Sequence, residues 1–362
     1  MDRKTTGIDF AVIGHQDSWQ NIISFVNDIR GSGLEPMTGE NIRNTFPYIP
    51  PRDIFKIKVS SKTGTEIRGV YIETFIDPEK LDSKFARQNI NKVTAAVSWA
   101  KKMGARIVAL GGFTSILLEG NLLGLSSGNT SFTTGNTLTA SYIVKALERA
   151  AMQHAIRLNE SNVLIVGATG DIGMGCIDYL KDKTGKLLLC ARNLQRLEKL
   201  SAQLKNENIH VENDVSIDKL IPQADIIICV ASTTGIRLEN CRKNVLICDA
   251  GYPKNLETKI EDNAGINLFH GGMGQANAGY EFDPDYSAAV YKYAAPYISH
   301  GCILEAIVLA FENKFENYSE GKGNITRCKM EDIYQMSLRH GIDIAPFYNS
   351  KGLWQYDKQI MQ

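Results

Sequence analysis

A cysteine opens an apolar, helix-like run near the C-terminal end of the chain. Residues 300–314 read HGCILEAIVLAFENK, so Cys302 follows a glycine at the start of that run. Backbone amides at a helix N-terminus favour the thiolate, the nucleophilic form of cysteine. With an ordinary thiol pKa of ~8.5, about 3% is ionised at pH 7, and a drop of one unit raises this to about a quarter. Two interpretations follow: Cys302 is a catalytic nucleophile, or it is a small buried core residue.

The other six cysteines have more ordinary surroundings. Three lie in apolar runs typical of buried strands, one in a predicted helix and two in polar connections: Cys190, Cys229, Cys248, Cys176, Cys241 and Cys328. An odd number of cysteines without a CxxC pair fits a reducing compartment better than a disulfide framework or a zinc site. The spacing of His15, His270 and His340 does not suggest a metal site either.

A glycine-rich turn joins a predicted strand to a predicted helix in NVLIVGATGDIGMGCIDYL, residues 162–180. Gly167 lets the chain turn sharply off the strand, and Gly170 lets the backbone approach a pyrophosphate. Gly173 lets the helix pack closely, with its N–H groups directed at the phosphates. The spacing is GxxGxxG, one residue longer in its first gap than GxGxxG. Because the strand, the helix and the next strand all fit, the sequence predicts a dinucleotide site.

The second strand of this unit indicates which dinucleotide binds. It ends in LLLCARNLQR, with Arg192 where an acid would select a free ribose 2′-hydroxyl. A 2′-phosphate accepts charged hydrogen bonds from a guanidinium, so NADPH is predicted. Later strands end at VAS, AGY and a glycine pair, at the edge where ligands bind in such folds. The predicted cofactor-binding residues are Gly167, Ala168, Thr169, Gly170, Asp171, Ile172, Gly173, Arg192, Asn193, Val230, Ala231, Ser232, Gly251, Tyr252, Gly271 and Gly272.

The elements around these residues predict an α/β protein. From Asn162, apolar strands alternate with helices, which is typical of a doubly wound parallel sheet, a Rossmann domain. Before it come a predicted hairpin at 54–74, a helix at 80–104 and a bridging helix at 138–158. The predicted domains are an N-terminal α/β substrate domain (1–155), a Rossmann domain (156–290) and a helical C-terminal segment (291–362).

Composition narrows the class of protein. Of the 362 residues 40 are basic and 40 acidic, so no overall charge points to nucleic acid or an anionic membrane. The chain has neither a signal-peptide core nor an apolar run of about 18 residues, so a cytoplasmic protein without a transmembrane segment is expected.

A hydride donor combined with a thiolate points to thioester reduction: the sulfur attacks, the carrier thiol leaves, and the bound acyl group accepts hydride to give an aldehyde.

Several motifs in one order resemble a known family. FAVIGHQDSW, YIETFIDPEKL, ALGGFTSI, FTTGNTLTA, GATGDIG, CARNLQRL, PQADIIICVAS and DAGYPKNL are similar to segments of the long-chain acyl-(acyl-carrier-protein) reductases, best known from cyanobacteria. The resemblance runs over almost the whole chain. The family's nucleophile lies in a Cys-x-x-Glu-Ala setting, which here is Cys302 with Glu305 and Ala306.

The resemblance implies an NADPH-dependent oxidoreductase that forms a fatty aldehyde through an acyl group on Cys302. It implies an acyl-carrier-protein thioester as the donor, sometimes the coenzyme A ester, and an aldehyde-deformylating oxygenase as a consumer of the aldehyde. The residues implied near the acyl and thioester end are Gly111, Gly112, Phe113, Thr133, Thr134, Gly135 and Asn136. Two alternatives remain: an NADP-dependent dehydrogenase of a small polar substrate, with shikimate-dehydrogenase-like architecture, or a non-catalytic NADP(H) sensor.

Overall fold

The computed structural model describes residues 7–81, 83–117, 128–237, 240–252, 254–256, 265–290, 292–320 and 323–354. The chain forms two compact units that interleave in sequence. Unit 1 holds residues 1–135, 276–321 and 336–342, and unit 2 holds residues 136–275, 322–335 and 343–362. These boundaries differ from the contiguous domains expected from the sequence, because the segment after residue 275 returns to the N-terminal unit.

Unit 1 is built on a six-stranded mixed sheet in the order β13-β2-β3-β1-β4-β5. Its strands are β13 (Tyr280–Asp283), β2 (Arg52–Ser60), β3 (Glu66–Glu73), β1 (Phe10–Gly14), β4 (Ile107–Leu110) and β5 (Ser131–Thr133). The run β3-β1-β4-β5 is parallel, whereas β2 pairs antiparallel with β3 as the predicted hairpin. The carboxyl ends of the four parallel strands therefore meet at one edge of this sheet.

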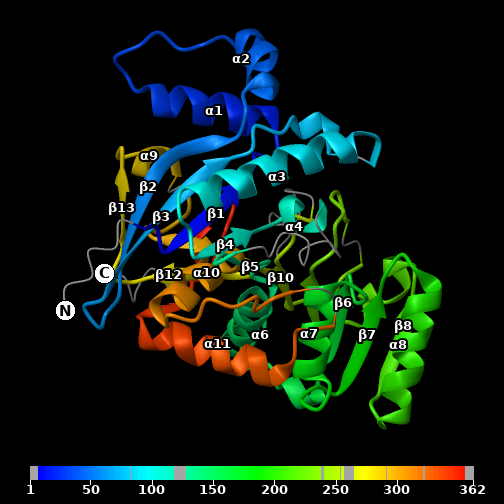
Figure 1. Ribbon diagram of the computed structural model, residues 1–362. Coiled ribbons are helices and arrows are strands. Elements are labelled where there is room, and N and C mark those ends of the chain that lie inside the picture. Colours follow the sequence, from blue (N-terminus) through cyan, green and yellow to red (C-terminus); the bar gives the residue numbers. More distant parts are fainter. Residues whose placement is uncertain are drawn as a thin grey trace. The chain divides into compact units, whose positions relative to one another are not determined.

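Helices cover both faces of the unit 1 sheet (Figure 1). On one face α3 (Ala86–Lys102) packs through Val93, Ala96 and Val97 on apolar side chains of β1, β3 and β4. On the other face lies α10 (Gly301–Phe311), an almost wholly buried helix in contact with β4 and β1. Side chains alternate between the faces of a strand, so this sheet is buried on both sides.

The remaining described helices of unit 1 are shorter or peripheral. They are α1 (Trp19–Arg30), α2 (Gly39–Thr45), α4 (Phe113–Leu117) and α9 (Ser287–Val290). Ser18 and Thr38 cap α1 and α2, each accepting a hydrogen bond from a backbone N–H of the first turn. A separate apolar cluster of Trp19, Ile22, Ile42, Phe46 and Phe75 holds these two helices together.

Unit 2 contains a six-stranded, fully parallel sheet in the order β11-β10-β9-β6-β7-β8. Its strands are β6 (Asn162–Val166), β7 (Lys186–Cys190), β8 (Val211–Asp214), β9 (Ile226–Cys229), β10 (Val245–Asp249) and β11 (Ile266–His270). The chain runs outward from β6 to β8 and then returns to β9 on the other side of β6. This reversal is the switch point of a doubly wound fold, so the predicted fold class is confirmed.

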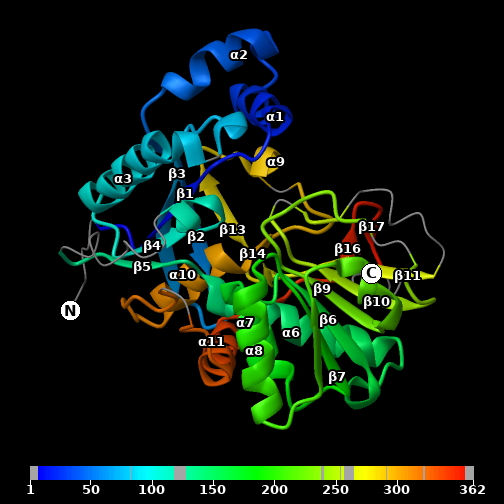
Figure 2. The same ribbon diagram turned by 90° about the vertical axis from the view of Figure 1, so that its right-hand side faces the viewer.

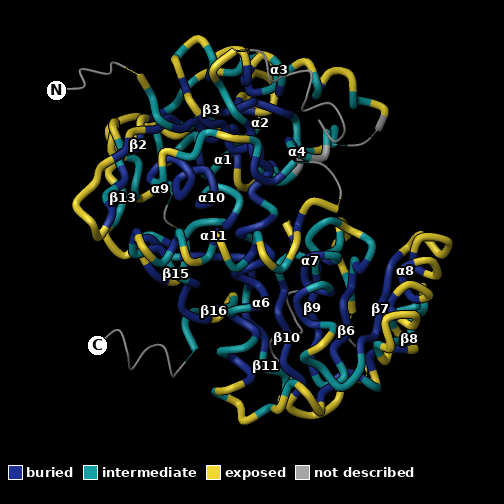
Figure 3. The backbone as a smooth tube through the Cα atoms, turned by 60° about the horizontal axis from the view of Figure 1, so that its bottom comes forward, coloured by how far each residue is buried: buried dark blue, intermediate teal, exposed yellow. Residues whose placement is uncertain are grey.

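The helices of unit 2 are α6 (Asn136–Gln153), α7 (Asp171–Leu180), α8 (Leu194–Asn206) and α11 (Arg327–Arg339), whose last residues belong to unit 1. Figure 2 shows α7 and α8 beside strands β6 and β7, and Figure 3 shows those strands buried while α8 is exposed along one side. The short strands β12 (Met273–Ala276), β14 (Ile298–His300), β15 (Ile342–Ile344), β16 (Tyr348–Asn349) and β17 (Gly352–Leu353) form sheets β14-β12-β15 and β16-β17. The predicted C-terminal segment thus contains strands besides its helices α10 and α11.

The Gly-, Ser- and Thr-rich stretch 111–137 contains the short elements α4 and β5, while residues 118–127 lie outside the described part of the chain. In the ranges that the structure describes, no helix combines the length and apolarity that crossing a membrane requires.

Candidate active site

Cys302 lies in the first turn of α10, directly against two glycine-rich segments of unit 1. A Cβ atom added to Gly111, just after β4, would lie 2.7 Å from the Cys302 sulfur. A Cβ atom added to Gly135, just after β5, would overlap the Cα of Cys302 and lie 2.7 Å from its carbonyl carbon. Gly135 also has a φ of 70°, which side-chain-bearing residues rarely adopt. The structure therefore brings together Cys302, Gly111 and Gly135 at the carboxyl edge of the sheet.

Glu305 fastens the β5 end of this site to the helix. Its fully buried carboxylate accepts a short hydrogen bond from the Thr133 hydroxyl, and the same hydroxyl accepts one from the Gly135 N–H at 3.1 Å. The N–H and hydroxyl of Thr134 both donate to the Ser319 carbonyl at 3.1 Å. Glu305 thus positions the 133–135 turn.

The segment after β4 turns directly into α4. Gly112 has a φ of 58°, and its carbonyl accepts a hydrogen bond from the Ser115 hydroxyl at 2.7 Å. The Thr114 hydroxyl donates in the same way to the Gly111 carbonyl at 2.8 Å. Phe113 begins α4, but its side chain lies outside the described part of the structure. Asn136 belongs to unit 2, where its side-chain amide donates to the Asp171 carboxylate at 3.2 Å.

The pKa of the Cys302 thiol contradicts the expectation of a helix-stabilised thiolate. Burial raises this pKa to about 12, the backbone amides of Ile303 and Cys302 lower it only in part, and the charge of Glu305 raises it further. The predicted helix-terminal amides are therefore present, but desolvation outweighs them because a buried thiolate loses its hydration. This raised pKa favours the protonated thiol at neutral pH, although Cys302 remains partly exposed.

Two further side chains lie beside the thiol. The Tyr293 hydroxyl and the His300 Nε2 are 3.0 Å apart, and His300 is the N-cap residue of α10. Burial and the neighbouring Cys302 both raise the pKa of the Tyr293 phenol, which keeps it neutral and able to donate. The sequence analysis did not single out Tyr293.

A buried carboxyl group at the same edge was also missed. Glu73 ends β3 in register with Gly14 of β1, and Leu110, which precedes Gly111, pairs with the residue before Gly14. Residues in register on parallel strands share a face, so Glu73 lies on the face that α10 covers. Its carboxylate accepts hydrogen bonds from the Tyr71 hydroxyl at 2.8 Å and from Gln16 at 3.2 Å, while burial raises its pKa. A single acid in a strand gives no signal in the sequence.

In unit 2 the glycine-rich turn follows β6 at the switch point. Gly167 has a φ of 94°, and a Cβ atom there would lie 2.7 Å from the Val230 carbonyl oxygen at the end of β9. A Cβ atom on Gly173 would overlap the Gly167 carbonyl and lie 3.1 Å from the Ala168 Cα. Gly170 is the N-cap residue of α7. This close-packed turn at a helix N-terminus is a cradle that fits a dinucleotide pyrophosphate, with Ala168–Gly173 around it.

Arg192 and Ser232 meet although 40 residues separate them. The Arg192 guanidinium donates to the Ser232 hydroxyl at 3.1 Å, and both residues are exposed beyond the ends of β7 and β9. Asn193 caps α8, accepting a hydrogen bond from the Arg196 N–H at 2.9 Å. The Arg192 guanidinium at the end of β7 is therefore available to a ribose phosphate.

Asp249 and Asn255 hold the backbone in place beyond the ends of β9 and β10. The sequence did not indicate a role for either residue. The buried Asp249 carboxylate accepts hydrogen bonds from the N–H groups of Gly251, Asn255 and Leu256 at 3.1 to 3.2 Å. Asn255 exchanges two hydrogen bonds with the Ala231 backbone, at 2.9 and 2.8 Å. A Cβ atom on Gly251 would overlap the Asn255 side chain, which explains the glycine. These residues position Ala231 and Gly251, while Tyr252 is exposed.

The glycine pair after β11 has a packing role. A Cβ atom on Gly271 would overlap the Cys248 sulfur, and one on Gly272 would lie 3.0 Å from the Thr139 methyl group. Gly272 also has a φ of 70°. Gly271 therefore lets the end of β11 pack closely on β10, and Gly272 lets it approach α6.

Most of the other cysteines lie as the sequence indicated, but Cys328 lies in the first turn of α11 rather than in a polar connection. Cys176, Cys190, Cys229 and Cys248 are buried, and burial raises the thiol pKa of each, to about 12 for Cys176 and about 11 for Cys190. Cys328 is exposed.

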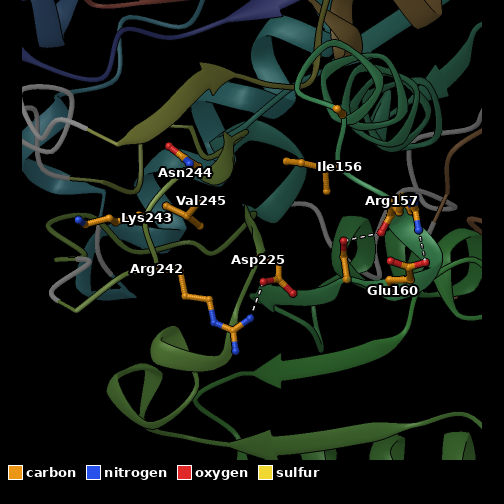
Figure 4. A pocket seen from close by; sticks show the side chains of 10 residues that line it. Ile156, Arg157, Glu160, Asp225, Arg242, Lys243, Asn244 and Val245 are labelled. Atoms are coloured by element: carbon orange, nitrogen blue, oxygen red, sulfur yellow. Dashed lines mark hydrogen bonds and ion pairs between the residues drawn. The ribbon is translucent and has the colours of Figure 1, made fainter.

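The hollow in Figure 4 lies away from these residues, at the amino edge of the unit 2 sheet. It has a volume of about 350 Å³ and contains two ion pairs, Arg242 with Asp225 and Arg157 with Glu160 at 2.9 Å. Ligands of doubly wound sheets bind at the carboxyl edge, so this hollow is not the nucleotide site.

Comparison with known proteins assigns a class and then a family. A model of the shikimate/quinate 5-dehydrogenase family matches residues 148–270, which covers the nucleotide part of unit 2 and stops before Cys302. The chain is 35% identical over 347 residues to the long-chain acyl-[acyl-carrier-protein] reductase of Synechococcus elongatus, covering 92% of this chain and 97% of that protein. The protein is thus an oxidoreductase with a nicotinamide cofactor. It belongs to the long-chain acyl-[acyl-carrier-protein] reductase family.

Other relatives are more distant. The chain is 26% identical over 295 residues to the aminotransferase PigE of a Serratia species, covering 80% of this chain but 34% of that protein. Among solved structures, L-tryptophan dehydrogenase from Nostoc punctiforme is 11% identical with a TM-score of 0.39, covering 92% and 81% of the two chains. A likeness this weak does not bear on function.

Proposed function

We propose that this protein reduces a long-chain fatty acyl thioester to the fatty aldehyde, with NADPH as reductant and an acyl group held on Cys302. The observation that carries the proposal is the contact of Cys302 with Gly111 and Gly135. Both glycines lie in motifs shared with the family, ALGGFTSI and FTTGNTLTA, and a side chain at either would press on the nucleophile. Their absence of side chains leaves room for a thioester at the sulfur.

The first step transfers the acyl group and conserves protons. The Cys302 sulfur attacks the thioester carbonyl, the carbon–sulfur bond to the carrier breaks, and the thiol proton passes to the departing carrier thiol. Because the proton leaves as the carrier thiol forms, the step does not require a stored thiolate, in keeping with the raised pKa of Cys302. The amides of Cys302 and Ile303 stabilise negative charge as it develops on the sulfur.

The second step reduces the acyl group. A nicotinamide cofactor held by unit 2 would supply the hydride that the acyl carbon accepts. The bond to Cys302 then breaks, the sulfur regains a proton, and the aldehyde departs. Tyr293, a neutral phenol beside the thiol and bonded to His300, is our candidate for the proton donor at this step.

The residues of unit 2 support NADPH over NADH. Gly167, Gly170 and Gly173 would hold the pyrophosphate at the start of α7. Arg192 would pair with the 2′-phosphate beside Ser232, the position at which an NAD-specific protein has an acid. Asp249 and Asn255 would orient the backbone at Ala231 and Gly251 toward the cofactor.

The carrier of the acyl group is proposed by analogy with the family to which the chain belongs. The Synechococcus relative is named for acyl-carrier-protein thioesters, and we propose the same donor here, with the coenzyme A ester as a second one. We propose that the aldehyde is consumed by a further enzyme, such as an aldehyde-deformylating oxygenase.

An intact-mass measurement tests the proposal. The protein is incubated with hexadecanoyl thioester of the carrier protein in the absence of NADPH. We expect an adduct of acyl mass that Cys302→Ala abolishes and that added NADPH discharges as hexadecanal. A dehydrogenase of a small substrate would show no adduct and would keep its activity in Cys302→Ala. A sensor would bind NADPH and release no aldehyde.

A further inference from the structure

A lysine lies among the strand ends of unit 2, in the segment 250–256 that follows β10. The Lys254 ammonium donates a hydrogen bond to the main-chain carbonyl of Asp249 at 3.0 Å. The side chain is only partly exposed, and burial lowers its pKa. A cation removed from water costs free energy unless other groups make up for the lost hydration. The partners of Lys254 therefore indicate its role.

The partners that the chain itself supplies do not account for this charge. The Asp249 carbonyl already accepts a hydrogen bond from the Gly271 N–H at 2.9 Å, so it is satisfied without the ammonium. The Asp249 carboxylate accepts three backbone N–H groups instead, and in the described part of the chain no carboxylate forms an ion pair with Lys254. An ammonium has three N–H donors. Since the described residues engage one of them, two are left for a ligand.

The ammonium lies at the carboxyl ends of β10 and β11. Asp249 ends β10 in register with His270, which ends β11. The charge of Lys254 adds to burial in lowering the pKa of the His270 imidazole to about 3, so the two side chains are neighbours. The charge of Asp249 attracts the ammonium to the same place. Lys254 is therefore located at the edge of the sheet where ligands of doubly wound folds bind.

The strand order of unit 2 indicates which half of the cofactor lies at this end of the edge. A dinucleotide binds across the switch point, between β6 and β9, with its pyrophosphate at the start of α7. Arg192 at the end of β7 would take the 2′-phosphate of the adenosine half. The nicotinamide half would then lie on the side of β9, β10 and β11, which follow one another in Figure 2 and include the strand that precedes Lys254.

We propose that Lys254 binds the nicotinamide half of the cofactor, donating its two remaining N–H groups to the oxygen atoms of the ribose and the carboxamide. This inference rests on the proposed function for the identity of the cofactor, and it adds a residue that holds the reactive end. Hydrogen bonds from a charged donor are stronger than those from a neutral one. Asp249 acts on the same segment through its backbone, whereas Lys254 would contact the ligand itself.

Equilibrium binding to the full-length chain, without a thioester, tests the proposal. Calorimetry gives the Kd for NADPH and for adenosine 2′,5′-bisphosphate, which lacks the nicotinamide half. We expect Lys254→Gln to raise the Kd for NADPH about 10- to 100-fold, the loss typical of a charged donor, and to leave that for the bisphosphate unchanged. Lys254→Arg keeps the charge and should restore most of the NADPH affinity.

Lys243→Gln is the matched control, because Lys243 is exposed beside the amino end of β10, and it should change neither Kd. The Asp249 carbonyl keeps its bond to Gly271 in Lys254→Gln, so this variant should fold, and its thermal unfolding without cofactor checks that.

Three results would overturn the proposal. An unchanged Kd for NADPH in Lys254→Gln would mean that the ammonium does not touch the cofactor. Equal losses for NADPH and the bisphosphate, or a loss in Lys254→Arg as large as in Lys254→Gln, would assign Lys254 a structural role in the segment 250–256. The proposed function is judged separately by the acyl adduct on Cys302, so failure of one test is distinguishable from failure of the other.

Discussion

The sulfur of Cys302 experiences two opposing influences. The amides at the start of α10 stabilise negative charge on it, whereas burial and the Glu305 carboxylate oppose that charge, and the opposing influences win. A neutral thiol reacts more slowly with oxidants and alkylating agents than a thiolate does. In our proposal Cys302 becomes nucleophilic as its proton passes to the departing carrier thiol.

Removing the charge of Glu305 tests this balance. Glu305→Gln keeps an acceptor for the Thr133 hydroxyl, so the turn should stay in place, but the negative charge that raises the pKa of Cys302 is lost. We therefore expect the thiol pKa to fall below about 12. The rate of iodoacetamide labelling of Cys302, measured by peptide mass across pH 7 to 10.5, should rise at lower pH in the variant than in the native protein.

The exposed thiol of Cys328 provides the internal control for labelling, since its rate should be the same in both proteins. If the Cys302 profile does not move, or moves to higher pH, Glu305 does not act on the sulfur through its charge. A labelling rate of native Cys302 that levels off below pH 9 would contradict the raised pKa itself.

At the scale of elements, three segments meet around the Cys302 sulfur: the end of β4, the end of β5 and the start of α10. Parallel strands place their carboxyl ends at one edge, and α10, which covers one face of the sheet, begins at that edge. Glycine is therefore needed at these positions because the elements pack closely there, and not because a loop has to be flexible.

Gly111→Ala tests that packing. Gly111 has no left-handed backbone conformation to lose, so the new methyl group acts through its 2.7 Å approach to the Cys302 sulfur. We expect acyl transfer to slow about 100-fold, because a displacement near 1 Å at a nucleophile costs that much, while NADPH affinity in unit 2 stays unchanged. Adduct formation followed by mass measures the effect.

Gly33→Ala is the matched control for this change, because a Cβ atom there meets nothing within 4 Å. Acyl transfer at the native rate in Gly111→Ala would show that the sulfur can turn aside, and the contact would then not define the site.

The sequence predicted those elements whose patterns are local. The hairpin of β2 and β3, the parallel sheet of unit 2 and the glycine turn at Gly167 follow from side-chain alternation, apolar runs and turn residues. The contact of Gly111 with Cys302 was implied by resemblance alone, because it joins residues 191 positions apart. Glu73 and Asn255 were missed because their roles depend on which buried groups surround them, and the raised pKa of Cys302 depends on burial in the same way.

In our proposal, the connection from β7 to α8 determines the preference for NADPH over NADH. Arg192→Gln keeps a donor for Ser232 but removes the charge, so the KM for NADPH should rise about 10- to 100-fold while the KM for NADH changes little. Steady-state kinetics with both cofactors measures this. Arg196→Gln, one turn further along α8, should leave both values unchanged. Equal loss with NADPH and NADH would assign Arg192 a structural role.

At the scale of the whole molecule, the chain leaves unit 1 after Gly135 and returns to it at Ala276. Cys302 therefore belongs to the unit that begins the chain, although it lies 191 residues after Gly111. Contiguous domains were expected because local patterns mark where elements begin but not which sheet a later helix covers.

Each unit buries a histidine: His15 in unit 1 and, less completely, His270 in unit 2, where burial lowers the pKa to about 3.

His15 makes the stability of unit 1 sensitive to acid. Burial lowers its pKa to about 4, from 6.5, and the neighbouring Asp17 offsets this only in part. Between these pH values the unfolded chain binds a proton that the folded chain does not, so stability falls as the pH drops through this window. The titration of this one group should lower the free energy of unfolding by about 2 kcal/mol between pH 7.5 and pH 5.

Urea unfolding followed by tryptophan fluorescence should show His15→Gln losing less stability over this range than the native protein, by about that amount. His210→Gln, at an exposed position, should lose as much as the native protein. Parallel losses in the native protein and His15→Gln would show that His15 is protonated in the folded state and is not the acid-sensitive group.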